Sequence, residues 1–204
     1  MTIPPCELPS RCPGNVRHRL VPLGLPISEA VVERDRGSGE PRLVLYFERQ
    51  RFEYHPEHAR TPYHVLLGRL GAEALEHQGR AWQTLPAASP STPHYFRETG
   101  HAIAPQFWDY WRSHGLELGD RGVSVREALA LFGYPISEPQ VERNSSGDHV
   151  LIQWIERTHV EFHPGSARPY QVLLGRLAAD RLRIKGRQRI WSAWGSIELA
   201  PCPV

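Results

Sequence analysis

The chain has 204 residues, of which 40% are hydrophobic and 23% charged, and its net charge is +2. These values are typical of a folded protein and exclude a highly charged disordered chain. So small a net charge gives no reason to expect a nucleic-acid partner. No stretch approaches the roughly 20 apolar residues that span a membrane, and the first 20 residues contain no apolar run of signal-peptide type.

The three cysteines lie in the terminal tails, at Cys6, Cys12 and Cys202. Cys6 and Cys12 could close a small loop, or one of them could tie the N-terminus to Cys202, and either bond would suit an oxidising compartment. Unpaired thiols are the other interpretation. No CxxC pair occurs, so we expect no zinc knuckle.

An internal repeat dominates the rest of the sequence. The two copies begin with Gly-x-Pro-Ile-Ser-Glu at Gly24 and Gly133, and about half of the aligned positions are identical. They share Val-Glu-Arg at 32–34 and 141–143, Glu-Arg at 48–49 and 156–157, Glu-aromatic-His-Pro at 53–56 and 161–164, and Pro-Tyr-x-Val-Leu-Leu-Gly-Arg-Leu at 62–70 and 169–177. Duplication of one unit accounts for this pattern.

In chain order, the first copy predicts a β-hairpin from strands 43–47 and 52–54, preceded by an exposed Gly- and Ser-rich turn at 35–40. A helix should follow, because Tyr63, Leu66, Leu67, Leu70 and Ala74 recur at the spacing of one helical face and Pro62 suits a first turn.

The second copy predicts the same elements, with strands at 150–155 and 160–162 and a helix after Pro169. An aromatic helix over 105–114, closed by Gly115, precedes it and has no counterpart in the first copy. Residues 190–199 predict a last strand. The fold class is therefore α+β, with two similar small lobes, each a β-hairpin or small antiparallel sheet with one or two helices.

These elements divide the chain into five parts. An N-terminal tail with Cys6 and Cys12 covers residues 1–23, and the first copy covers residues 24–84. A Pro- and Ser-rich linker covers residues 85–94. The second copy with its aromatic helix covers residues 95–184, and a C-terminal strand or tail covers residues 185–204.

The second copy contains the string Thr99-Gly100-His101, the aromatic helix, Phe132 to Glu138, Glu156-Arg157 and Glu161 to Pro164. With these motifs it resembles a module of uncharacterised bacterial extracytoplasmic proteins. The core is also similar to the LGFP repeat of bacterial cell-surface proteins. This resemblance implies envelope attachment and a secreted or cell-surface location, while the sequence itself leaves a cytoplasmic location open. Neither family implies a catalytic motif.

The residues with reactive side chains have simpler structural interpretations. His55 and His163 precede prolines and more simply fix a turn than act on protons, and the neighbouring His58 has Ser166 as its counterpart, so a metal site would not be duplicated. Ser28 and Ser137 lack a nucleophile elbow and should cap turns. The two Glu-Arg pairs should make ion pairs or backbone contacts. Several arginines could form an anion-binding face, but a solvated surface is the simpler interpretation: Arg51, Arg60, Arg69, Arg168 and Arg176.

We therefore predict no catalytic residue, no metal ligand and no cofactor. The candidates for ligand binding are one histidine and four aromatic residues whose rings could stack on a sugar or peptide: His101, Trp108, Tyr110, Trp111 and Trp154. The expected function is non-catalytic binding or scaffolding at the bacterial envelope, with a cell-wall polymer, glycan or surface protein as partner. The alternatives are a hydrolytic enzyme with a site between the lobes around His101, and a structural spacer. Any function is expected in what the copies do not share, or in the surface that they form together.

Overall fold

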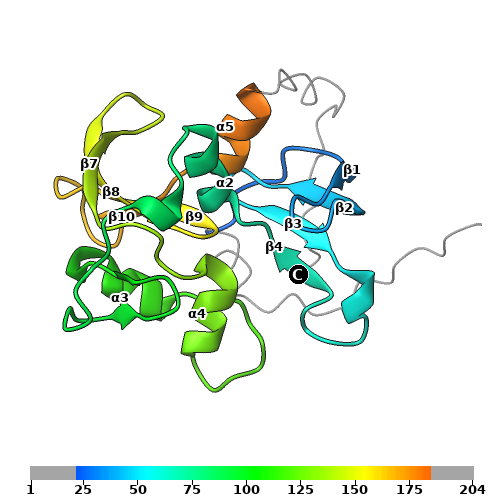
Figure 1. Cartoon of the computed structure of the whole chain (residues 1–204), viewed down its shortest axis with the longest axis horizontal. Coiled ribbons are helices and arrows are strands. Elements are labelled where there is room, and N and C mark those ends of the chain that lie inside the picture. Colours follow the sequence, from blue (N-terminus) through cyan, green and yellow to red (C-terminus); the bar gives the residue numbers. More distant parts are fainter. Residues whose placement is uncertain (1–21, 185–204) are drawn as a thin grey trace, which may run out of the picture.

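The computed structural model describes residues 22–184 and contains two four-stranded antiparallel sheets, one from each copy (Figure 1). The first sheet has the order β1 (Val31–Arg34), β2 (Pro41–Tyr46), β3 (Arg51–Tyr54) and β4 (Val65–Leu67). The second has the order β10 (Val172–Leu174), β9 (Thr158–Phe162), β8 (His149–Ile155) and β7 (Gln140–Arg143). A third sheet pairs β5 (Tyr95–Phe96) with β6 (His101–Ala102).

Four α-helices accompany the sheets in the described part of the chain: α2 (Leu70–His77), α3 (Pro105–Ser113), α4 (Val125–Phe132) and α5 (Leu177–Ile184). Two short 3-10 helices are η1 (Pro56–His58) and η2 (Trp82–Thr84). The predicted α+β fold with small antiparallel sheets is confirmed, as are both β-hairpins and the aromatic helix α3. None of the helices in residues 22–184 is long and apolar enough to cross a membrane. The predicted strand at 190–199 and the three cysteines lie outside the described residues.

The two sheets share one register, so the duplication is visible in the pairing of the strands. Val44 pairs with Glu53 in the first sheet, and the equivalent Ile152 pairs with Glu161 in the second. The repeated serines hold the strand that precedes each hairpin: the Ser28 hydroxyl accepts a hydrogen bond from the Tyr46 amide at 3.0 Å, and Ser137 accepts one from Trp154 at 3.0 Å. These bonds support a structural role for both serines.

The prediction of one helix starting at Pro62 or Pro169 was wrong. Residues 65–67 and 172–174 form edge strands, and the helices start only at Leu70 and Leu177. Strand pairing continues one residue further, because the amide of Gly68 donates to the Arg51 carbonyl at 2.8 Å and that of Gly175 to the His159 carbonyl at 3.0 Å. The leucines fit a helical spacing, but pairing with β3 and β9 satisfies the backbone of this segment instead.

Each copy contributes its helix to the other copy. Helix α2 packs on β8 and β9 of the second sheet and on α5. The amide of Ala72 donates to the carbonyl of Glu156 at 3.1 Å, and the amide of Ala179 donates to that of Glu48, also at 3.1 Å. Since Ala72 and Ala179 are equivalent positions, as are Glu156 and Glu48, the copies are related by an approximate two-fold axis.

Two apolar cores result from this exchange. The first lies between the sheets and contains side chains from both copies: Val44, Tyr46, Leu70, Leu75, Ile136, Ile152, Trp154, Leu177, Ala178 and Leu182 are among them. The second lies under α3 and α4 on the other face of the second sheet, and Phe107, Trp111, Leu131 and Phe132 are buried there. Helix α4, which the sequence analysis did not predict, begins at a capping box in which Ser124 and Glu127 bond each other's backbone amides.

Within residues 22–184, no helix equivalent to α3 covers the outer face of the first sheet. In the second sheet this face includes Phe162, whose ring packs edge-on against Phe107 of α3 at 6.5 Å. The equivalent row across the first sheet stays exposed, and it consists of Val32 (67%), Leu43 (45%), Tyr54 (44%) and Val65 (38%). The first sheet therefore presents an apolar row on the face that α3 covers in the second sheet.

Candidate functional site

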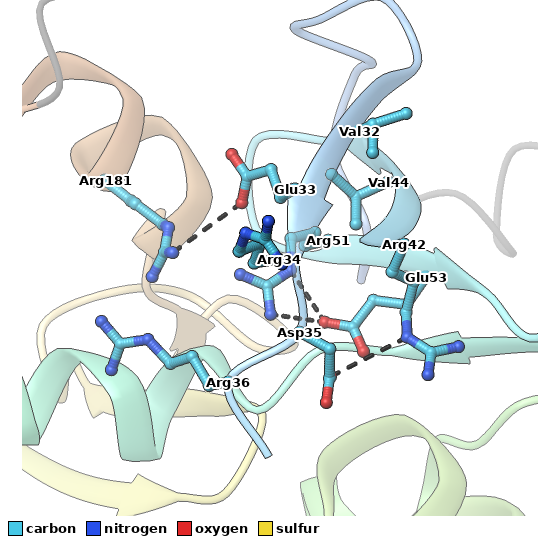
Figure 2. Close-up of a pocket in the computed structure, with 10 residues that line it drawn as sticks. All are labelled: Val32, Glu33, Arg34, Asp35, Arg36, Arg42, Val44, Arg51, Glu53 and Arg181. Carbon is cyan, nitrogen blue, oxygen red and sulfur yellow. Dashed lines mark hydrogen bonds and ion pairs between the residues drawn. The ribbon is translucent and has the colours of Figure 1, made fainter. Parts of the chain in front are cut away.

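A cavity of about 310 Å³ opens beside β1, the edge strand of the first sheet, where α5 of the second copy approaches the sheet. Figure 2 shows that its walls come from β1, the turn after β1, β2, β3 and α5. Five arginines, three carboxylates and two valines line it: Arg34, Arg36, Arg42, Arg51, Arg181, Glu33, Asp35, Glu53, Val32 and Val44. We refer to it as the arginine pocket. Its volume is at the lower end of the range of small-ligand sites.

A buried carboxylate holds the floor of the arginine pocket together. Glu73 of α2 is 7% exposed and accepts hydrogen bonds from Arg51, at 2.6 and 3.2 Å, and from Arg181. Burial alone would raise the pKa of Glu73, but the bonds and charges of these arginines outweigh it and lower the pKa. Arg51 also pairs with Glu53, and its pKa is raised, since these two carboxylates outweigh its own burial. The floor is therefore a buried network of ion pairs centred on Glu73 and Arg51.

The rim of the pocket carries positive charge that is less fully paired. Arg34 donates to the Gly39 carbonyl at 3.0 Å and makes no ion pair with any residue in the described range 22–184. Arg36 pairs with Glu76 at 2.9 Å, and both side chains are nearly half exposed, so solvent screens this pair. Among the residues that line the pocket, five arginines face three carboxylates, while Glu73, Glu76 and Glu57 pair with these arginines without lining the pocket. An incoming anion would meet guanidinium groups at the rim.

The arginine pocket combines residues that the copies share with residues that only the first or the second copy has. Val32, Glu33, Arg34 and Glu53 have identical counterparts in the second copy, whereas three of the arginines do not. Sequence alignment places Val150 opposite Arg42, His159 opposite Arg51 and Ala74 opposite Arg181. It also lies where the copies meet, because Arg181 reaches Glu33 of the first sheet at 3.9 Å from a helix of the second copy (Figure 2). Of the five pocket arginines, only Arg51 is among the residues that the sequence suggested for an anion-binding face. A comparison of the copies position by position for gained charges would have shown Arg42 and Arg181.

The equivalent region of the second copy is built from histidines. Glu161 Oε2 accepts a hydrogen bond from Asn144 at 3.0 Å and lies 3.0 Å from His163 Nε2. Glu161 Oε1 lies 2.9 Å from His159 Nε2. Burial would raise the pKa of Glu161, but the contacts to His159 and Asn144 lower it to about 2. His163 thus holds a turn in place, as its position before a proline predicts.

The repeated Glu-Arg pairs clamp the two copies together rather than fixing their own turns alone. The carboxylate of Glu156 accepts a bond from Arg69 at 2.8 Å, and that of Glu48 accepts one from Arg176 at 2.7 Å. Arg157 donates to the Leu67 carbonyl, and Arg49 donates to the Leu174 carbonyl at 3.4 Å. Arg69 and Arg176 are therefore engaged between the copies and do not belong to the arginine pocket.

The five predicted ligand-binding residues do not share one exposed surface. His101, Trp111 and Trp154 are buried, at 2%, 1% and 4% exposure, and the Trp154 indole N–H donates to Glu142. Trp108 and Tyr110 are partly exposed. Trp108 stacks on His94, with the ring centroids 3.7 Å apart, and on Trp111, with the centroids 5.5 Å apart.

A wider groove of about 730 Å³ runs beside these tryptophans. It is lined by Trp108, Asp109, Trp111, Arg112, Ser113, Val123, Ser124 and Val125. Of the five predicted ligand-binding residues, Trp108 and Trp111 line this groove, while His101, Tyr110 and Trp154 do not.

His101 takes part in packing between segments. Its Nδ1 lies 3.2 Å from the Glu138 carboxylate, which also accepts the Ala102 amide at 3.2 Å. Neither the arginine pocket nor the tryptophan groove is lined by a histidine. The contacts of His101 thus join the strand before α3 to the Gly-x-Pro-Ile-Ser-Glu turn.

Comparison of the chain with protein-family models, curated proteins and solved structures finds no match. The resemblance to extracytoplasmic repeats therefore rests on the sequence motifs alone.

Proposed function

We propose that the protein is a non-catalytic binding module of the bacterial envelope, and that its arginine pocket holds an anionic group of a surface polymer. The observation that carries this proposal is the arginine pocket itself, in which guanidinium groups outnumber carboxylates and Arg34 has no acidic partner among residues 22–184. Guanidinium groups bind phosphate and carboxylate in a bidentate manner, so polymers that carry either group suit the site.

The roles of the repeated motifs support a binding function over catalysis. Ser28, Ser137 and the Glu-Arg pairs are engaged in backbone and inter-copy bonds. The enzyme alternative required a cleft in which His101 meets His55 or His163, whereas His101 contacts Glu138. Because the repeated serines and Glu-Arg pairs are occupied in these contacts, the charged pocket is the stronger candidate for holding a ligand.

The test is cosedimentation with purified bacterial cell-wall sacculi that retain their anionic polymers, beside sacculi from which phosphodiester-linked polymers have been removed by acid. We expect binding to the intact sacculi, weakened by salt, and at least about tenfold weaker binding for a variant with Arg34→Ala and Arg36→Ala, since one charge-assisted bond contributes about 1.5 kcal/mol. Arg97→Ala is the matched control, because its side chain is 91% exposed and lies far in sequence from the pocket.

Stripped sacculi distinguish the sources of negative charge. If the protein no longer binds sacculi without phosphodiester polymers, the bound group is a phosphate. If it still binds them, the bound group is a carboxylate of the wall. Equal binding by the wild type and the Arg34/Arg36 variant, or no binding to intact sacculi, would contradict the proposal.

The exposed apolar row on the first sheet favours a second candidate, which is scaffolding of another surface protein. The row is equivalent to the face that α3 covers in the second copy, so an amphipathic aromatic helix of a partner chain is the occupant that it fits. A synthetic peptide of residues 103–115 is the probe. It should bind the full chain, and Val32→Arg should abolish binding, while Val141→Arg, at the equivalent edge of the second sheet (70% exposed), should not. If both variants bound the peptide equally well, the apolar row would be excluded as the binding surface.

A further inference from the structure

The turn between β3 and β4 brings together three side chains of the kind that bind metal ions. His55, Glu57 and His58 each offer one ligand atom, and these atoms all lie within 4.8 Å of one another. Pro56 starts the 3-10 helix η1, which runs to His58 and brings the ends of this four-residue segment close together. The segment lies in the cyan loop beyond β3 in Figure 1.

We propose that His55, Glu57 and His58 form a site for a divalent transition-metal ion such as Zn²⁺. Two of the three ligand atoms are already at the separation of neighbouring ligands, since His55 Nδ1 lies 2.9 Å from Glu57 Oε1. Ligands that each stand about 2.0–2.1 Å from a zinc ion are about 3 Å apart. The exposed His58 offers the third ligand atom, and its ring stacks on that of His55 with the centroids 5.8 Å apart.

The other nitrogen of His55 provides a second, independent indication. Nε2 is buried and has no hydrogen bond, and it faces Glu53 Oε2 at 3.8 Å. Metal-bound histidines usually direct the nitrogen away from the metal at a carboxylate or carbonyl, which fixes the ring and its tautomer. Both side chains are mostly buried, with exposures of 13% for His55 and 12% for Glu53. The ring of His55 is thus held with Nδ1 toward Glu57 and solvent.

One nearby cation competes for the site. Arg42 Nη1 donates to Glu57 Oε1 at 3.1 Å. The same atom also donates to the Tyr54 carbonyl at 3.1 Å, and Arg42 Nε lies 3.8 Å from Asp35. Arg42 therefore keeps two partners when Glu57 turns toward a metal ion. Two imidazoles and one carboxylate suit Zn²⁺ and Ni²⁺, and three protein ligands leave a position for water or for a group of a partner.

The site is specific to the first copy. His163 and Pro164 are kept in the second copy, but Gly165 and Ser166 replace Glu57 and His58. The carboxylate behind the histidine is kept as well, because His163 Nε2 lies 3.0 Å from Glu161 Oε2. The second copy therefore keeps the histidine and the carboxylate behind it but lacks the other two ligands. A second metal site can be built there by substitution.

The first test is a Zn²⁺ titration of the full chain against a chromogenic chelator at pH 7.5, with the cysteines alkylated so that thiols do not bind zinc. We expect His58→Ala to weaken the binding of one equivalent by at least about tenfold. Since His58 is exposed, this variant should fold like the wild type, which thermal unfolding checks. His149→Ala, another exposed histidine, is the matched control and should titrate like the wild type. Identical titrations of His58→Ala and the wild type would overturn the proposal.

The second test adds a site instead of removing one. Gly165→Glu combined with Ser166→His reproduces the ligand pattern next to His163, and a side chain at position 165 meets no atom within 4 Å. The stoichiometry should rise from one to two Zn²⁺ per chain. A rebuilt second copy that adds no equivalent would contradict the claim that these four residues and the carboxylate behind them suffice.

Discussion

The amide of Ala72 donates a hydrogen bond to the carbonyl of Glu156 at 3.1 Å, from the first turn of a helix in one copy to the hairpin turn of the other. The reciprocal bond from Ala179 to Glu48 has the same length. Helix N-termini have free amides that need acceptors, and here each copy supplies the acceptor for the other. The repeated Glu-Arg turn is therefore the contact that joins the copies, which explains why it is kept in both.

This close approach predicts that Gly71→Ala destabilises the protein. A Cβ at position 71 would lie 1.9 Å from the carbonyl oxygen of Ile155 and 2.6 Å from that of Thr158. Alanine normally stabilises a helix relative to glycine by up to about 1 kcal/mol, so the sign of the effect is diagnostic. We expect a loss of about 2 kcal/mol, the range of overpacking, in urea-induced unfolding.

Gly165→Ala is the matched control for this change. Its Cβ would meet no atom within 4 Å, so we expect no loss of stability and a small gain from a less flexible unfolded chain. If Gly71→Ala unfolded at the same urea concentration as the wild type, α2 would not approach the second hairpin as closely as described.

The sequence predicted the local elements well because their signals are local. The hairpins follow from alternating residues between turn formers, and α3 follows from Pro105 and its aromatic face. The strand at 65–67 was predicted as helix because leucines at 66, 67 and 70 fit a helical face, and only its pairing with β3 decides otherwise. Helix α4 was missed although Ser124 and Glu127 carry the capping-box pattern.

The candidate site depends on contacts between distant segments, which no local pattern encodes. Trp154 looked like a ligand-binding ring, but it lies in the core shared by the copies. The arginine pocket needs Arg181 of α5 to lie against the first sheet, and this follows only from the exchange of helices. The sequence does show Arg42 and Arg181 as charged residues whose counterparts in the other copy, Val150 and Ala74, are apolar.

A second prediction concerns the pair of Tyr46 and Glu33. Tyr46 is fully buried and its hydroxyl donates to Glu33 Oε2 at 2.9 Å. Tyr46→Phe removes this bond and should cost about 1–2 kcal/mol of stability in chemical unfolding. Tyr54→Phe is the control, because Tyr54 is 44% exposed, and its change should stay within about 0.5 kcal/mol. Equal effects of the two substitutions would show that the buried bond contributes nothing.

A third prediction is a loss of stability in acid that depends on Glu161. Its folded pKa of about 2 lies below the ordinary value of 4.5, so its contribution is fully present above pH 4.5 and is lost as the pH falls through 2. The shift corresponds to about 3 kcal/mol. Glu161→Gln should lower stability at pH 7 and flatten its decline between pH 4.5 and 2 in urea unfolding. Glu29→Gln, at an exposed position, should keep the wild-type profile, and an unchanged profile in Glu161→Gln would contradict the assignment.

Asp180 should show the opposite dependence on pH. Asp180 is the equivalent of Glu73 in the second copy. Glu73 is stabilised by Arg51 and Arg181, but the equivalents of these two arginines are His159 and Ala74, which give Asp180 no such bonds. Burial therefore raises the pKa of Asp180 above its ordinary 3.8, despite the opposing charge of Arg183.

A carboxyl group whose pKa is higher in the folded state than in the unfolded state stabilises the fold in its protonated form. The free energy of unfolding should therefore fall as the pH rises from 3.8 through the folded-state pKa. Asp180→Asn removes the charge and should raise the unfolding midpoint at pH 7 by about 2–4 °C, with no difference from the wild type at pH 3. Scanning calorimetry at the two pH values measures this. A lower midpoint at pH 7 would mean that the carboxylate is stabilised by contacts with Arg183 and the helix N-terminus that outweigh its burial.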